Sequence, residues 1–171
     1  HVNGSNTAPV VFTSRSDDTS GGDTFHDGVQ PTPAGAWRAV FVNSAASDVV
    51  LNSLQIRYAG NTYGAGNPSG FANSLDISGA SVTATNLVVR DSDGNAINVD
   101  GGGALTATGG LLANSRSNDL VLNGGTATLS GFAIVSAPTG INVAKNSVVN
   151  VTASAFDGLT TGITTANTAS V

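Results

Sequence analysis

The feature that most constrains the fold of this chain is an internal repeat of about 22 residues. An alternating apolar segment that begins at Leu75 recurs at Ile97, Leu120, Ile141 and Ile163, with spacings of 22, 23, 21 and 22 residues. A second and a third short apolar run follow it in the successive repeats. A single short strand cannot bury its apolar side alone, whereas stacked repeats give each strand a neighbour and enclose a continuous core. The repeat therefore predicts a solenoid with three strands in each turn.

Three runs per repeat predict an all-β fold, a right-handed parallel β-helix with three faces and five to six coils. A left-handed form would favour strict six-residue steps, and a two-layer solenoid would show two strands per repeat; the sequence shows neither pattern. The first part of the chain fits the same register. Val40 and Leu75 are equivalent, as are Val49 and Val82, while the run at Val10 matches the one that begins at Leu54, two repeats later.

The composition agrees with short strands and excludes several classes of protein. All eleven acidic residues are Asp, Lys145 is the single lysine, and Glu, Met and Cys are missing, so the residues that helices favour are scarce. Without Cys there are no disulfides and no thiol catalysis. A net charge of −5 without basic clusters argues against nucleic-acid binding, and no apolar run is long enough for membrane insertion.

The length of 171 residues predicts one domain, residues 1–171. We expect it to be a fragment of a longer chain, because the sequence does not begin with Met and its last segment, from Ile163, only starts a new coil. Bare β-helix edges invite pairing with other strands. The open ends therefore predict neighbouring domains or stacked chains as partners.

Residues 9–60 contain a distinctive string, which includes Pro9 to Ser14, Gly21 to Thr24, Pro31 to Pro33, Ala34 to Trp37 and Ile56 to Gly60. That string is similar to a module of large secreted or surface-attached bacterial β-helix proteins. The repeat as a whole resembles the pectin-lyase-like superfamily. The resemblance implies an extracellular or cell-surface location. It does not assign a function, because the superfamily holds lyases, hydrolases, adhesins and plain stalks.

Two stretches interrupt the repeat, at about 15–36 and 61–73, and both follow a third strand. We expect these insertions to lie one above the other on one edge, which in repeat proteins is often the binding edge. The first insertion carries four acids that predict a calcium site, because calcium prefers several oxygen ligands. These residues are Asp17, Asp18, Asp23 and Asp27. The alternative is a solvated acidic loop whose Asp residues cap turns.

Aromatic residues gather around the same insertions, and aromatic faces on exposed loops stack well on sugar rings. The candidates for binding a polysaccharide or surface glycan are Trp37, Tyr58, Tyr63 and Phe71. The alternative is a hydrophobic plug that attaches the loops to the solenoid. Phe41 lies between the core positions Val40 and Val42, so we expect it to point outward or to lie under a loop.

A second site hypothesis concerns the corner after the third strand. Arg57 and Arg90 occupy equivalent positions there, and Asp91 and Asp93 follow. In the lyases of the resembled superfamily an Arg or Lys commonly acts as the base, so these four residues are the catalytic candidates of a polysaccharide lyase or glycoside hydrolase fragment. The alternative is an Arg–Asp pair in a turn, which contributes little.

Two further patterns follow from the register. Short polar turns between the second and third strands, such as Asn52-Ser53 and Thr85-Asn86, predict a side-chain ladder along the solenoid axis. Thr83, Thr106 and Thr128 align on the outside of the second face, as in some ice-binding solenoids. Together the sequence favours a non-catalytic extracellular spacer or adhesin element, with an enzyme fragment as the alternative and an ice-binding solenoid as a remote one.

Overall fold

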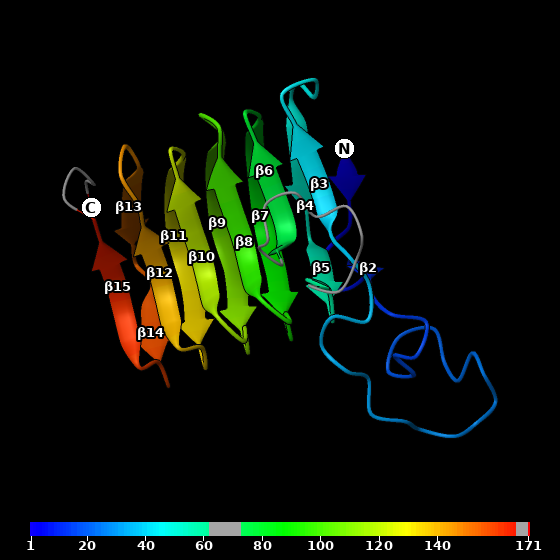
Figure 1. Ribbon diagram of the computed structural model, residues 1–171. Helices are drawn as coiled ribbons and strands as arrows, with labels where there is room; N and C mark the ends of the chain where they lie inside the picture. Colours follow the sequence, from blue (N-terminus) through cyan, green and yellow to red (C-terminus); the bar gives the residue numbers. More distant parts are fainter. Residues whose placement is uncertain (62–72, 167–170) are drawn as a thin grey trace.

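The computed structural model describes residues 1–61, 73–166 and 171, and all regular elements in these ranges are β-strands. They wind into one parallel β-helix, with the N-terminus at one end and the C-terminus at the other (Figure 1). The first face is a six-stranded parallel sheet. Its strands are β3 (Val40–Asn43), β6 (Asn73–Ser78), β8 (Asn95–Asp100), β10 (Asn118–Asn123), β12 (Thr139–Val143) and β15 (Thr161–Thr165).

The second and third faces belong to one nine-stranded sheet that bends along a corner. Its strands are β1 (Val2–Asn3), β2 (Val10–Phe12), β4 (Val49–Asn52), β5 (Leu54–Arg57), β7 (Ser81–Arg90), β9 (Ala104–Ala113), β11 (Thr126–Val135), β13 (Val148–Thr152) and β14 (Ala155–Asp157). The ten-residue strands β7, β9 and β11 cross the corner, and each has a residue there with positive φ: Asn86, Gly109 and Gly131. Each turn therefore has the three faces that the repeat predicts.

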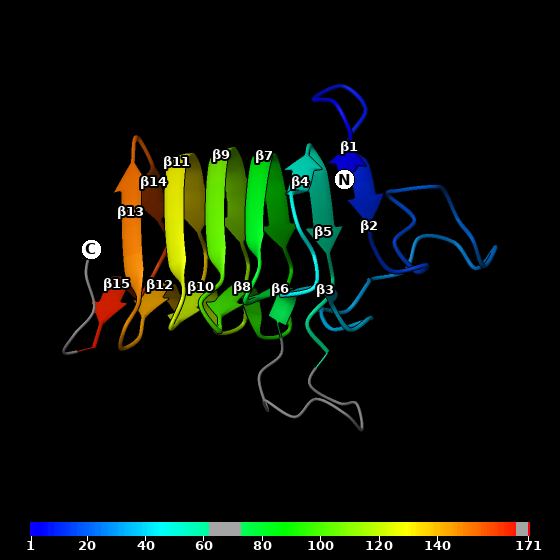
Figure 2. The same ribbon diagram turned by 90° about the horizontal axis from the view of Figure 1, so that it is seen from above.

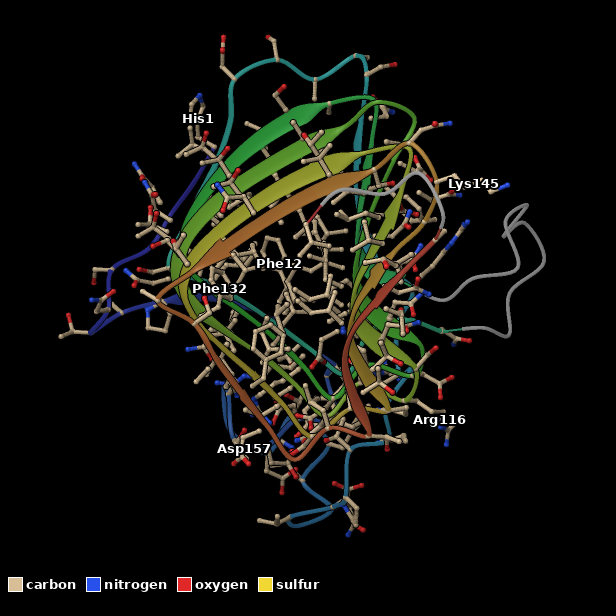
Figure 3. All side chains as sticks on the ribbon, turned by 90° about the vertical axis from the view of Figure 1, so that its left-hand side faces the viewer. His1, Phe12, Arg116, Phe132, Lys145 and Asp157 are labelled. Carbon is tan, nitrogen blue, oxygen red and sulfur yellow. The ribbon has the colours of Figure 1, made fainter. Side chains whose placement is uncertain are left out.

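The handedness is visible from the C-terminal end (Figure 3). The chain rises along the first face from the corner of Arg116 to that of Lys145, crosses the second face and descends along the third face toward Asp157. This path runs anticlockwise while successive turns come closer to the viewer, so the helix is right-handed, as predicted.

The strand register confirms the alignment of the repeats. Leu75 pairs with Ile97, Ile97 with Leu120, Leu120 with Ile141 and Ile141 with Ile163. The match across two repeats is also confirmed, because Val10 of β2 pairs with Leu54 of β5. The solenoid has about four turns, fewer than the five to six that we expected. The coils at the two ends are incomplete, because β1 and β2 have no strand of the first face before them and no described strand follows β15. Residues 13–39 hold no strand and form a loop that projects at the N-terminal end (Figure 2).

The interior is filled mainly by aliphatic side chains from all three faces (Figure 3). Among the described residues, the largest fully buried side chain is the aromatic ring of Phe132. Phe132 lies on the third face beside Gly110 of the preceding coil, which in turn pairs with Leu87. A Cβ atom at Gly110 would lie 2.2 Å from the carbonyl oxygen of Leu87 and 2.7 Å from the Phe132 ring. The glycine therefore provides the space that the aromatic ring occupies.

Two polar ladders run along the solenoid axis. The predicted one is present in the N-terminal coils, where Asn52 donates to Asn3 (3.1 Å) and Thr85 donates to Asn52 (2.7 Å). A second ladder was not predicted and lies at the start of the first face. It joins Asn73, Asn95 and Asn118 by hydrogen bonds of 2.9 and 2.7 Å, and all three side chains are largely shielded from solvent. Such ladders satisfy buried amides and hold successive coils in register.

Candidate functional site

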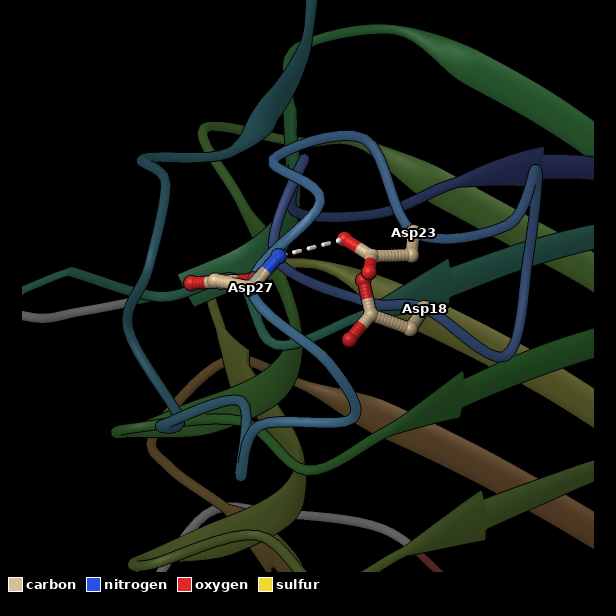
Figure 4. Close-up of side chains that lie close together, drawn as sticks. All are labelled: Asp18, Asp23 and Asp27. Carbon is tan, nitrogen blue, oxygen red and sulfur yellow. Dashed lines mark hydrogen bonds between the residues drawn. The ribbon is translucent and has the colours of Figure 1, made fainter.

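The loop between β2 and β3 brings three of the four predicted calcium ligands together. One carboxylate oxygen from each of Asp18, Asp23 and Asp27 lies within 4.8 Å of the others (Figure 4). Asp23 also accepts backbone N–H groups from Gly28 (3.0 Å) and Asp27 (3.3 Å). The Gly28 N–H is the main reason why the pKa of Asp23 is lowered. The cluster thus combines the turn-capping role of the alternative hypothesis with a geometry that suits a cation, and calcium binding stays a prediction.

Asp17 lies apart from that cluster. Its carboxylate is buried and accepts hydrogen bonds from the hydroxyls of Thr13 and Thr19, and it is 3.5 Å from an Nη atom of Arg57. Burial by itself would raise the pKa of Asp17, but the hydrogen bonds from Thr19 and Thr13 and the charge of Arg57 outweigh it, so the pKa is lowered. Asp17 therefore anchors the loop to the solenoid.

The aromatic residues proposed to bind sugars do not form a common surface among the described residues. Trp37 is partly buried against the core, and its Nε1 donates to the carbonyl of Arg57 at 2.7 Å. Tyr58 is partly buried, with the Arg90 guanidinium 5.8 Å above its ring. Trp37 thus acts as the hydrophobic plug of the alternative hypothesis. Tyr63 and Phe71 lie outside the described residues. Phe41 is 55% exposed, as expected from the strand alternation.

The catalytic candidates lie along the corner between the third and first faces, each in an ion pair. Arg57 contacts Asp17 and Gln55, and Arg90 contacts Asp91. Asp93 pairs with Arg116, a residue that the sequence analysis did not single out. Each of these arginines therefore has a carboxylate partner. Among the described residues, this corner therefore has the arrangement of the alternative hypothesis, Arg–Asp pairs in turns.

A surface hollow on the outside of the first face had not been predicted. This groove encloses about 500 Å³ over β6, β8, β10 and β12. Amide side chains dominate its lining, and Asp100 is the single charged residue among the described ones that line it. The lining residues are Asn73, Asn95, Asn98, Asp100, Ser117, Asn118, Val121, Asn123, Asn142 and Ala144. We refer to this hollow as the amide groove.

The hydrogen bonds beneath the amide groove orient its outer groups. Both N–H groups of Asn98 are used, toward Asp76 (2.9 Å) and Asp100 (3.0 Å), which leaves its carbonyl oxygen as an acceptor. The amide nitrogen of Asn118 donates to Asn95 and Ser117, so the side-chain oxygen of Asn118 is likewise left as an acceptor. Asn123 and Asn142 make no side-chain hydrogen bond with any described residue. The groove therefore offers fixed acceptors beside two amides that can both donate and accept.

A signal for this groove was present in the sequence. Asn73, Asn95 and Asn118 are spaced by 22 and 23 residues, the same spacing as the apolar repeat. The apolar positions and the turns between the second and third strands carried the predictions, and the recurrent amide at the start of the first face was missed. Val121 pairs with Asn98 on one side and with Asn142 on the other, so these three residues form a row along the outside of the first face. The register of the repeats by itself also implies this row.

The second face carries the aligned threonines. Thr83 pairs with Thr106 and Thr106 with Thr128, and all three side chains are exposed. A second file joins Thr85, Thr108, Ser130 and Thr152, while Asn150 ends the first file. The described outward positions of this array carry no charge.

Comparisons with protein-family models, curated proteins and solved structures found no match to this chain. The described segments also contain no helix of the length and hydropathy needed to cross a membrane. The fold itself is that of a parallel β-solenoid, and the function has to be argued from the surfaces above.

Proposed function

We propose that this chain is a non-catalytic module of a secreted or surface-attached bacterial protein of the pectin-lyase-like type. It acts as a rigid spacer or adhesin element that binds a neutral glycan in the amide groove. Rigidity follows from the continuous parallel sheets, the filled interior and the two ladders. In a longer chain, neighbouring domains or stacked chains would cover the open ends.

The observation that carries the binding proposal is the orientation of the amides. Sugar hydroxyls are both donors and acceptors, so they match Asn123 and Asn142 together with the fixed oxygens of Asn98 and Asn118. Of the described lining residues none is cationic, and Asp100 is negative, which disfavours an acidic polysaccharide. We therefore favour an uncharged polymer.

Affinity electrophoresis through gels that contain neutral or acidic polysaccharides tests this proposal. We expect a neutral polysaccharide to retard the protein, and replacing both Asn123 and Asn142 by Ala to weaken that binding about tenfold, because two hydrogen-bonding side chains are lost. Asn150→Ala, at an exposed amide of the second face, is the matched control and should migrate like the wild type. Equal retardation of the double variant would contradict the proposal.

The same gels test the remaining hypotheses for this chain. A cleared zone would support the lyase or hydrolase alternative and direct attention to Arg57, Arg90, Asp91 and Asp93. Running them with calcium and with chelator tests whether calcium at Asp18, Asp23 and Asp27 stabilises the loop. Equal retardation with calcium and with chelator would mean that glycan binding in the groove does not depend on calcium.

Ice binding is a second candidate because the threonine files are in register, exposed and without charge. A flat array of hydroxyl groups on a rigid sheet can order water. Thermal hysteresis is the measurement. We expect Thr106→Lys to abolish any activity, since a charge in the middle of the array disrupts ordered water, whereas Asn123→Ala on the first face should leave it unchanged. Absence of hysteresis in concentrated wild-type protein removes this candidate.

A further inference from the structure

A buried carboxyl group lies directly beneath the amide groove. Asp119 follows Asn118 on β10, and its side chain is fully shielded from solvent. Its Oδ1 accepts a hydrogen bond from the hydroxyl of Ser115 at 2.7 Å. Its Oδ2 is buried and accepts no hydrogen bond from any described residue. An unsatisfied buried oxygen of this kind is costly, and far more so when it carries a charge.

The neighbouring coils explain why Oδ2 has no partner among the described residues. The register places Asp119 opposite Ala96 of β8 and Gly140 of β12, and neither residue has a side-chain donor. Two coils earlier the equivalent residue is Ser74, whose hydroxyl contacts that of Ser92 at 2.7 Å. A carboxyl group thus stands in a row of positions that otherwise hold small or hydroxyl side chains.

Among the described residues, no ion pair includes Asp119. Of the elements packed against β10, the strands β9, β11 and β12 carry no titratable residue, and β8 carries only Asp100 at its end. The turns that lead into β8 and β10 carry Asp91, Asp93 and Arg116, of which Arg116 and Asp93 pair with each other and Asp91 pairs with Arg90. Burial therefore dominates and raises the pKa of Asp119 to about 7, although the Ser115 hydroxyl acts in the opposite direction.

We propose that Asp119 is a pH-responsive element that controls the order of the coil beneath the amide groove. In acid the neutral carboxyl group is tolerated inside the solenoid. As the pH rises toward neutrality, opening of β10, which carries Asn118 and Asn123 of the groove, is increasingly favoured, because the carboxyl group ionises freely only when it is exposed to water. The effect on ligand binding rests on the proposed function, whereas the effect on folding does not.

The sign and size of the effect follow from linkage. The unfolded chain loses the Asp119 proton near its ordinary pKa of 3.8, while the folded chain keeps it up to about 7. The unfolding constant should therefore rise about tenfold per pH unit between these values, roughly 10³-fold in all, and then level off. Asp17 and Asp23 have lowered pKa values, so their contribution is lost only as the pH falls below the ordinary range of Asp.

The test is urea unfolding of the wild type and of Asp119→Asn from pH 4.5 to pH 8.5. We expect the wild-type unfolding constant to rise at least a hundredfold across this range and that of Asp119→Asn to stay nearly constant. Asp157→Asn, which removes an exposed carboxyl group, is the matched control and should follow the wild type. Parallel curves for the wild type and Asp119→Asn would overturn the proposal.

If Asp119→Asn does not fold, a carbon-13 NMR titration of the wild-type carboxyl groups decides the question. A resonance of Asp119 with its midpoint near pH 7 supports the proposal, and a midpoint near pH 4 overturns it. The regulatory part is tested on the neutral-polysaccharide gel, where retardation of the wild type should decline as the pH rises from about 4 toward 7 and then level off, while that of Asp119→Asn should persist. If neither protein is retarded at any pH, the glycan proposal fails, while the pH-dependent unfolding still tests Asp119.

Discussion

Gly110→Ala is expected to lower the free energy of unfolding by about 3 kcal/mol, because the added methyl group has no room. It would lie 2.2 Å from the carbonyl oxygen of Leu87 and 2.7 Å from the ring of Phe132. The carbonyl belongs to the neighbouring strand of the same sheet, so it cannot move without disturbing the sheet hydrogen bonds. Urea denaturation monitored by circular dichroism measures the change.

Gly162→Ala is the matched control, since Gly162 also lies in a parallel strand. The atom nearest to its added Cβ is a ring carbon of Phe156 at 4.0 Å, an ordinary contact distance. We expect its free energy of unfolding to stay within about 0.5 kcal/mol of the wild type. Equal stabilities of the two glycine variants would show that Gly110 is not required by close packing.

Asn95→Ala is expected to destabilise the protein by about 3 kcal/mol, because Asn95 is the middle member of the ladder on the first face. Its amide donates to Asn73 at 2.9 Å, and its oxygen accepts from the side chain of Asn118 at 2.7 Å and from the Asn118 backbone N–H at 3.3 Å. The substitution removes the partner of the buried Asn73 oxygen and two of the hydrogen bonds that the partly buried Asn118 donates, and each lost partner costs about 1–3 kcal/mol. Thermal and urea unfolding provide the measurement.

Asn123→Ala is the matched control, because it removes an asparagine side chain that does not belong to the ladder. Asn123 is exposed and makes no side-chain hydrogen bond with the described residues, so its loss should change the stability by less than about 0.5 kcal/mol. An Asn95→Ala variant as stable as Asn123→Ala would mean that the ladder does not hold the coils together.

Much of the fold was predictable because the repeat consists of apolar residues at regular spacings. Leu75, Ile97 and Leu120 must face inward at every coil, and a slip by one residue would expose all of them, so the register follows from the pattern. The number of coils was overestimated because the ends of the chain supply only partial coils: β1 and β2 lack a strand of the first face, and no described strand follows β15. An apolar run predicts a strand, but it does not show whether a complete coil surrounds it.

The candidate site was less predictable, since its parts come from different coils. The four acids of the first loop were visible in the sequence, but the sequence did not show that they serve two different roles. Asp17 pairs with Arg57, 40 residues later in the chain. Asp18 instead lies close to Asp23 and Asp27. The amide groove likewise combines side chains from four strands. Which amides are used up in ladder bonds and which remain available depends on distances between coils.

The sequence by itself determined the period, the three strands per turn, the parallel register and the outward threonine files, because burial of apolar side chains enforces all of them locally in each repeat. The tertiary structure alone decided how many turns form, which carboxylates and amides have partners, and that Asp119 lies between Ala96 and Gly140 without a second donor. Hydrogen bonding and desolvation depend on the neighbours above and below each residue. Those neighbours are set only once the coils have stacked.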